Sequence, residues 1–230
     1  MLDHVTDGFM RLLSWCFVLV LGSGAMFAPD ARSETAAAPL KVHFIGNSHT
    51  IVNDVPSQVR RQLQASKGAS VVDSIVKRGA RLISFTRRMD VVSKLEGTGW
   101  DVLVLQEASA TFVRPEGPSR FHEAIDWFRQ RVPARTRIVL YQTWPWRDDS
   151  RYLRRYGSTS QTMWGVMRRE YAKAARGARI DVAPVGSCWL DSPERETFYS
   201  TDGNHATPAG SRLAADVIAR TIENGSRQRC

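Results

Sequence analysis

The stretch FIGNSHT, residues 44–50, joins the end of an apolar strand to a Gly-Asn-Ser turn and the start of a helix. In open α/β sheets, functional sites form at the edge where the carboxyl ends of the parallel strands lie. This stretch therefore places the hydroxyl of Ser48 at that edge, where it is a candidate nucleophile. A Gly-Asn-Ser turn after a strand is also ordinary loop chemistry, so companion motifs have to decide between the two interpretations.

Strands recur along the chain outward from this stretch. They are predicted at 41–45, 71–76, 101–105, 137–141 and 179–182. The central strands contain the continuous apolar runs VLVL and IVLY, which are typical of parallel strands covered on both faces. A length of 230 residues is that of a single domain, long enough to bury a core without disulfides or metal.

Helices are predicted between the strands, because apolar residues recur there with a period of about 3.6. The first helix carries the stripe Val55, Val59 and Leu63, and the second carries Leu82, Phe85, Met89 and Val92. Further helices are predicted at 119–131 and 160–175, and a last one opens at Thr207 and Pro208 with Leu213, Val217 and Ile218 facing inward. The alternation predicts an α/β fold, a flavodoxin-like three-layer α/β/α sandwich with a five-stranded parallel sheet.

The N-terminal segment has the pattern of a secretory signal peptide. Residues 12–21, LLSWCFVLVL, are too few to span a bilayer, which takes about 20 residues, and small residues follow them. We predict a signal peptide at 1–28 with cleavage between 25 and 31, a flexible lead-in at 29–39, one domain at 40–224 and a tail at 225–230. An uncleaved anchor is the alternative. The protein is expected to be exported to the periplasm or secreted, where Cys188 and Cys230 could pair.

The composition is strongly basic, with a formal net charge of +9. Arginine pairs are scattered over several predicted elements, which favours a generally cationic surface suited to anionic envelope glycans or lipids over a nucleic-acid-binding stripe. A solvated surface without a partner explains the charge equally well. No nucleic acid partner is expected, and the protein is expected to be a monomer. The sequence has neither a metal-ligand cluster nor a phosphate-binding glycine loop, so no metal or cofactor is expected.

A serine nucleophile needs a base, and the best candidate is His205. Imidazole suits this task because its pKa lies near neutrality. His205 lies in a polar loop before the last helix, and the carboxylate of Asp202, three residues upstream, can curl back to hold its Nδ1 proton. The other histidines are less suited; His49, for example, directly follows Ser48, where neighbouring side chains diverge.

These blocks, taken in order, resemble the SGNH (GDSL-like) hydrolase superfamily. The similarity is greatest to a bacterial branch with GNS in place of GDS, a Q-E-x-S segment after the third strand and D-G-x-H near the end, and it spans about residues 40–222. The resemblance implies that Ser48 is the nucleophile and that Asp202 and His205 are the acid and base of a Ser-His-Asp triad.

The resemblance also implies an oxyanion hole with three donors. Two are the backbone N–H groups of Ser48 and Gly79, and the third is an amide side chain after the third strand. This chain departs from the family's G-x-N-D pattern, because Gln106-Glu107-Ala108-Ser109 stands there. In one register Gln106 supplies the amide, whereas in another Ala108 occupies the donor position and has nothing to donate.

Further residues are candidates for contact with the substrate. Asn47 replaces the usual aspartate as a turn or cap residue, and Glu107 and Ser109 are expected to bond within their loop or to shape the pocket. Residues 144–159 form a long polar and aromatic loop at the same sheet edge as Ser48, which we interpret as a substrate wall or lid. Its Trp144 and Trp146 either stack on sugar rings or pack the loop.

The hypothesis from the sequence is an exported serine esterase that cleaves small acyl esters, such as acetyl esters, on carbohydrate. Its partner is then a small-molecule or glycan ester, with association to an anionic envelope surface. The same triad could serve an acyltransferase, a lipase or a thioesterase. An envelope-binding module with weak catalysis is the alternative from another class.

Overall fold

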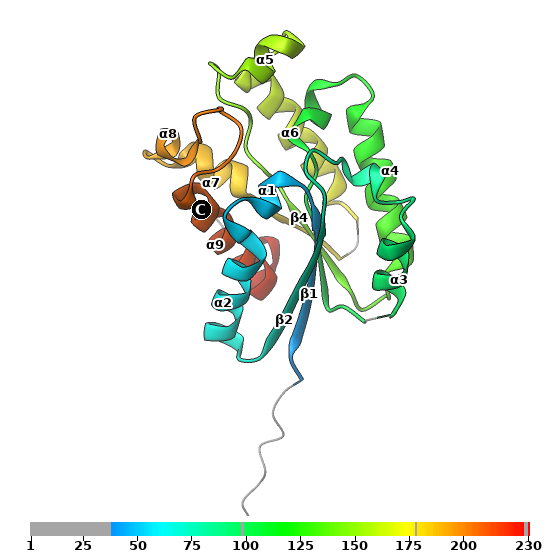
Figure 1. The fold of residues 1–230 in the computed structure, drawn as a ribbon. Helices are drawn as coiled ribbons and strands as arrows, with labels where there is room; N and C mark the ends of the chain where they lie inside the picture. The colour runs from blue at the N-terminus through cyan, green and yellow to red at the C-terminus, as the bar shows by residue number, and fades with distance from the viewer. Residues whose placement is uncertain (1–37, 98, 178, 228–229) are drawn as a thin grey trace, which may run out of the picture. The chain divides into compact units, whose positions relative to one another are not determined.

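The fold is built on a parallel sheet with the strand order β2-β1-β3-β4-β5 (Figure 1). The computed structural model describes residues 38–97, 99–177, 179–227 and 230, so the predicted signal peptide and most of the lead-in lie outside the described residues. The strands are β1 (Leu40–Gly46), β2 (Ser70–Val76), β3 (Val102–Leu105), β4 (Arg137–Tyr141) and β5 (Ile180–Ala183). The predicted parallel sheet and its flavodoxin-like order are confirmed.

Helices cover both faces of the sheet, as Figure 1 shows. On one face lie α2 (Val55–Lys67), α7 (Val185–Asp191), α8 (Arg195–Phe198) and α9 (Pro208–Asn224). On the other face lie α3 (Met89–Gly97), α4 (Gly117–Arg131), α5 (Arg151–Tyr156) and α6 (Ser160–Ala174). Short elements complete the chain, namely α1 (Ser48–Ile51) and the 3-10 helices η1 (Val52–Asp54), η2 (Leu82–Ser84), η3 (Ser109–Val113) and η4 (Gly225–Arg227).

Alternation along the strands divides the core into two apolar clusters. Val42 and Phe44 of β1 pack toward α2 and α9, whereas Ile45 packs toward α3 and α4. Side chains of a strand alternate between the faces, so consecutive apolar residues supply both clusters. All four residues of β3 are buried, and this burial on both faces explains why its sequence, VLVL, contains no polar residue.

One predicted helix is divided in the structure. Leu82 lies in η2 and Phe85 in the turn that follows, and both are fully buried, but α3 begins only at Met89. Because η2 and α3 are separate elements, their apolar residues do not share one helical stripe. Met89 is 75% exposed, and Val91 and Leu95 face the core in place of Val92.

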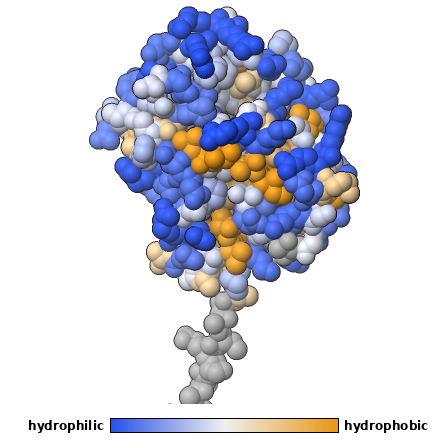
Figure 2. Space-filling model, in the orientation of Figure 1, coloured by the Kyte–Doolittle hydropathy of each residue, from blue (hydrophilic) through white to orange (hydrophobic). Residues whose placement is uncertain are grey.

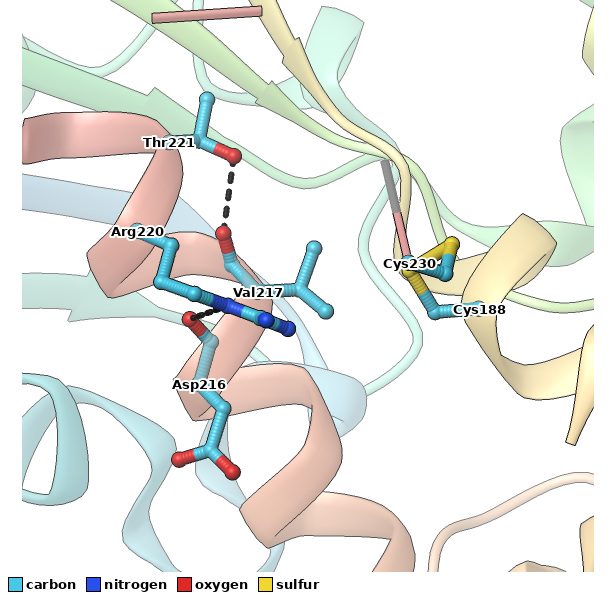
Figure 3. The surroundings of a disulfide bond; sticks show 6 residues. All are labelled: Cys188, Asp216, Val217, Arg220, Thr221 and Cys230. Atoms are coloured by element: carbon cyan, nitrogen blue, oxygen red, sulfur yellow. Dashed lines mark hydrogen bonds between the residues drawn. A yellow bond between two sulfur atoms is a disulfide. The ribbon is translucent and has the colours of Figure 1, made fainter. Parts of the chain in front are cut away.

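A disulfide joins Cys188 of α7 to Cys230, with a Cα–Cα distance of 5.0 Å and a sequence separation of 42. Figure 3 shows it near the part of α9 that carries Val217 and Thr221. The chain before it is also anchored, because Ser226 bonds through its backbone N–H and its hydroxyl to the carboxylate of Asp181 on β5, at 2.9 Å and 2.8 Å. The predicted tail therefore returns to the sheet.

The surface in the view of Figure 2 is largely hydrophilic, with hydrophobic residues gathered across its middle. Val71 on the edge strand β2 is one exposed apolar residue, at 45%. Among the described residues, none of the helices has the length and apolar character needed to span a bilayer.

Candidate active site

The topology concentrates loops at one place on the sheet edge. β1 pairs with β2 on one side and with β3 on the other, so the loops after β1 and β3 diverge and leave a crevice between them. A cavity of about 350 Å³ lies there. Its wall is formed by Asn47, Ser48, His49, Arg78, Gly79, Ala108, Ser109, Ala110, Trp146, Tyr152, Arg155, Tyr156, Asn204 and His205.

The turn that carries Ser48 is held by local hydrogen bonds. The side chain of Asn47 caps α1 by accepting from the backbone N–H of His49 at 3.2 Å, and its amide donates to the carbonyl of Ala80 at 3.0 Å. Gly46 precedes it because a Cβ there would lie 2.4 Å from Thr50 Oγ1. Asn47 is 1% exposed, so it positions the turn and links it to the loop after β2.

The three predicted triad residues come together. His205 Nε2 lies 2.9 Å from Ser48 Oγ, and His205 Nδ1 lies 2.6 Å from Asp202 Oδ2. The other carboxylate oxygen of Asp202 accepts the backbone N–H groups of Asn204 at 3.0 Å and His205 at 2.9 Å. Burial alone would raise the pKa of Asp202, but these hydrogen bonds outweigh it and hold that pKa below its usual range. The contact with Asp202 can orient the ring of His205, and the contact with Ser48 allows the hydroxyl proton to move to His205 Nε2.

Two backbone donors of the expected oxyanion hole line the cavity. Neither the N–H of Ser48 nor that of Gly79 has a hydrogen-bond acceptor within the part of the chain that the structure describes. Gly79 has φ +68°, a conformation that L side chains rarely adopt, although a Cβ would meet no neighbouring atom within 4 Å. Glycine is therefore required there by conformation and not by space.

Gln106 does not fit the predicted role of third donor. It is 1% exposed and is not among the residues that line the cavity. Its Oε1 accepts from the N–H of Asn47 at 2.8 Å and from Thr50 Oγ1 at 3.0 Å, while its Nε2 donates to the carbonyl of Glu107 at 2.6 Å. Its amide group therefore stabilises the turn from the buried side and does not face the cavity. In the other register, Ala108 faces the cavity without a donor group.

Glu107 lies behind the cavity wall and does not reach a substrate. Its carboxylate accepts from the N–H of Ala108 at 2.6 Å, from the hydroxyl of Thr111 at 2.9 Å and from the N–H of Leu82 at 3.3 Å. Burial raises the pKa of Glu107 to about 7. Its function in the fold is to join η3 to η2, whereas Ser109 lines the cavity.

The two tryptophans hold the loop that carries His205. Trp144 is fully buried and stacks on Trp189 at a centroid distance of 3.8 Å, so it cannot stack on a sugar. Its indole N–H donates to the carbonyl of Asn204 at 2.9 Å, and that of Trp146 donates to the side-chain Oδ1 of Asn204 at 2.7 Å. Both therefore hold the residue that precedes His205. Trp146 also lines the cavity, although it is only 3% exposed.

Several cavity residues had not been predicted. The predicted wall loop supplies Tyr152, Arg155 and Tyr156, all from α5, and the loop after β2 supplies Arg78. Arg155 belongs to one of the arginine pairs from which the sequence predicts a cationic surface, whereas Arg78 has no predicted role. The order of aromatic and basic residues in α5 does not show which of its side chains face the sheet edge. His49 faces the cavity too, because the one-turn helix α1 directs it beside Ser48.

Comparisons with known proteins agree on the architecture. No family model matches the sequence, and a search of curated proteins finds no relative either. Among solved structures, "a putative SGNH hydrolase from Slackia heliotrinireducens" is 27% identical with a TM-score of 0.73, covering 80% of this chain and 100% of that one. A DUF4886 family protein from Bacteroides uniformis is 19% identical, with a TM-score of 0.67 and coverage of 84% and 87%. The lipase/acylhydrolase from Enterococcus faecalis is 16% identical, with a TM-score of 0.65 and coverage of 83% and 100%.

Proposed function

Because this chain belongs to the SGNH (GDSL-like) hydrolase superfamily, we propose that it cleaves carboxylic esters by covalent catalysis through Ser48, His205 and Asp202. One observation carries the assignment of residues. It is the continuous hydrogen-bonded chain from Ser48 Oγ through both ring nitrogens of His205 to Asp202. This chain lies beside the cavity and beside two backbone N–H groups that have no acceptor among the described residues.

The geometry supports a two-step reaction. In the first step, Ser48 Oγ bonds to the carbonyl carbon while its proton moves to His205 Nε2, and the carbonyl π electrons move onto oxygen. The C–O bond to the alcohol then breaks and His205 returns the proton to that oxygen, leaving an acyl group on Ser48. In the second step, water repeats the sequence and releases the acid. Asp202 stabilises the imidazolium in both steps.

The cavity favours a small acyl group. Its volume of about 350 Å³ lies at the lower end of the range of roughly 300 to 1,000 Å³ that ligand pockets occupy. An acetyl ester, with part of its alcohol carrier, matches this size. Tyr152 and Tyr156 of the wall are half-buried and offer aromatic surface to a sugar.

The charge around the cavity favours an anionic carrier. Arg78 and Arg155 both line it, and neither contacts a carboxylate among the described residues. The described residues that line the cavity include no carboxylate. A glycan with carboxylate or phosphate groups, as found in bacterial envelopes, would supply the missing counter-charge. Export to the periplasm or beyond is part of this proposal.

The test is release of p-nitrophenol from p-nitrophenyl acetate by the chain from about Asp30, which is the mature protein under this proposal. Turnover should vanish in Ser48→Ala, with the folded state checked by circular dichroism. A binding module would show no turnover in either protein and would retain glycan binding in Ser48→Ala. A fluorophosphonate that labels Ser48 would distinguish an enzyme that rejects the reporter ester from such a module.

A further inference from the structure

Neither residue expected to supply the side-chain donor of the oxyanion hole does so, since the Gln106 amide bonds to the turn outside the cavity and Ala108 has no donor group on its side chain. We propose that the hydroxyl of Ser109 is the third donor, and that His49 and Thr143 are positioning residues that direct its proton into the cavity. This inference rests on the proposed function, because a hydrolase forms the oxyanion that the hydroxyl would stabilise.

Thr143 accounts for one lone pair of Ser109. Its Oγ1 lies 3.3 Å from Ser109 Oγ, and Thr143 is fully buried where the chain leaves β4. Among the described residues, Ser109 is the only hydrogen-bond partner of this hydroxyl. A buried hydroxyl without an acceptor is costly. Thr143 therefore donates its proton to Ser109.

His49 accounts for the second lone pair. Its Nε2 lies 3.3 Å from Ser109 Oγ. The side chain of Asn204 lies near the ring and favours its protonated form, but the buried Nδ1 makes no hydrogen bond of good geometry within the described ranges. Burial, followed by the charge of His205, lowers the pKa of His49 to about 3, so the ring is neutral and carries one proton. If the proton were on Nδ1, a buried N–H would have no acceptor, which is rarer in proteins than a buried nitrogen lone pair without a donor. The proton therefore belongs on Nε2, which donates it in a hydrogen bond to Ser109 Oγ.

The ring of His49 is also fixed in direction. It packs edge-on against Trp144, with a centroid distance of 5.0 Å and an interplanar angle of 88°. Trp144 is itself fully buried, so the ring rests on a rigid part of the core. A positioning role toward Ser109 explains why a buried histidine follows Ser48 directly, although it is not part of the proposed triad.

The remaining proton of Ser109 then points into the cavity, since both lone pairs are occupied. When Ser48 attacks, the carbonyl oxygen gains negative charge, and Ser109 stabilises it by a hydrogen bond together with the N–H groups of Ser48 and Gly79. The O–H bond of Ser109 stays intact throughout. Two donated hydrogen bonds polarise this hydroxyl, which strengthens the bond that it donates.

The experiment measures the rate at which a fluorophosphonate labels Ser48, because phosphonylation also places an oxygen in the oxyanion hole and needs no known substrate. Ser109→Ala should slow labelling and ester turnover by about 10² to 10³, with KM nearly unchanged. The flanking residues are Ala108 and Ala110, so alanine fits the local backbone. Ser109→Thr, which keeps a hydroxyl, should recover most of the rate.

The outcomes separate the two proposals. Labelling of Ser109→Ala at the wild-type rate would overturn the role of Ser109 and leave the hydrolase assignment standing. Failure of wild-type Ser48 to label would instead overturn the hydrolase assignment, and the third donor with it. Ser48→Ala, which cannot be labelled, is the control.

A second variant tests the positioning role of His49. His49→Phe keeps the edge contact with Trp144 but removes the Nε2 donor. Labelling should slow by about 2- to 10-fold, and affinity for phenylboronic acid, which forms a tetrahedral adduct with Ser48, should fall equally while KM stays constant. A loss of melting temperature without this selective loss of rate and affinity would show that His49 is only structural.

Discussion

Replacing Asp202 by asparagine should invert the proton arrangement of His205 while leaving the loop intact. Oδ1 of Asp202 accepts two backbone N–H groups, so an asparagine keeps its own Oδ1 at that position. Its Nδ2 then lies where Oδ2 lies now, 2.6 Å from His205 Nδ1, and donates to that nitrogen. The ring proton is forced onto Nε2, which can no longer accept the proton of Ser48.

The magnitude follows from this inversion. A serine hydrolase whose base is held in the wrong tautomer loses about 10³ to 10⁴ in turnover, equivalent to about 4 to 5.5 kcal/mol of barrier. The side chain of Asp202 is 30% exposed, and its two backbone hydrogen bonds survive. We therefore expect stability to fall by only about 1 kcal/mol or less, a shift of roughly 2 to 4 °C in melting temperature.

The assay compares kcat/KM on p-nitrophenyl acetate with the thermal midpoint for Asp202→Asn and the wild type. Asp149→Asn is the matched control, because Asp149 is a 66% exposed carboxylate that pairs with Arg147 outside the triad. The control should stay within about twofold of wild-type activity. The reasoning is refuted if Asp202→Asn keeps more than a tenth of the activity, or if activity and melting temperature fall in proportion.

Three further predictions concern pH, charge and the disulfide. Burial lowers the pKa of His43 to about 4 and that of His49 to about 3, while burial raises the pKa of Glu107 to about 7. Near pH ~5.5, unfolding thus takes up two protons and releases one, so the free energy of unfolding should rise with pH by roughly 1 kcal/mol per unit; urea titrations should show this slope, and its persistence in His43→Phe would contradict the assignment. Arg155→Glu should reduce kcat/KM by about 3- to 10-fold on an acetylated anionic sugar at low salt, with little change on a neutral one; equal losses on both would argue against the anionic carrier. Cys188→Ser opens a cross-link with a sequence separation of 42 and should lower the free energy of unfolding by about 4 kcal/mol, as measured by urea unfolding without reductant; an unchanged midpoint would show that the bond contributes nothing.

The positions of the three proposed triad residues could be predicted because their determinants are local. The strand before Ser48 ends in a tight turn, and Asp202 reaches His205 within a single loop, so only the sheet topology was needed to bring the two segments together. Parallel strands place their carboxyl ends at one edge, and alternating strands and helices predict parallel strands.

The environment of Trp144 and Gln106 could not be predicted in the same way. Trp144 bonds to a carbonyl 60 residues away, and Gln106 bonds to an amide 59 residues away. Both residue types suit a pocket as well as a core, and only their neighbours in space decide which they occupy. The same holds for the division between η2 and α3, where apolar residues at helical spacing belong to two elements.

The sequence by itself determined the class of fold, the strands and the motif of the proposed triad, because each depends on periodicity or on contacts within a few residues. Only the tertiary structure decided which side chains face the cavity. Gln106 and Trp144 are buried outside the cavity, whereas Arg78 and Arg155 line it. His49 lies within hydrogen-bond distance of Ser109. The physical reason is that burial and hydrogen-bond partners depend on contacts between segments far apart in the sequence. Local sequence patterns carry no information about those contacts.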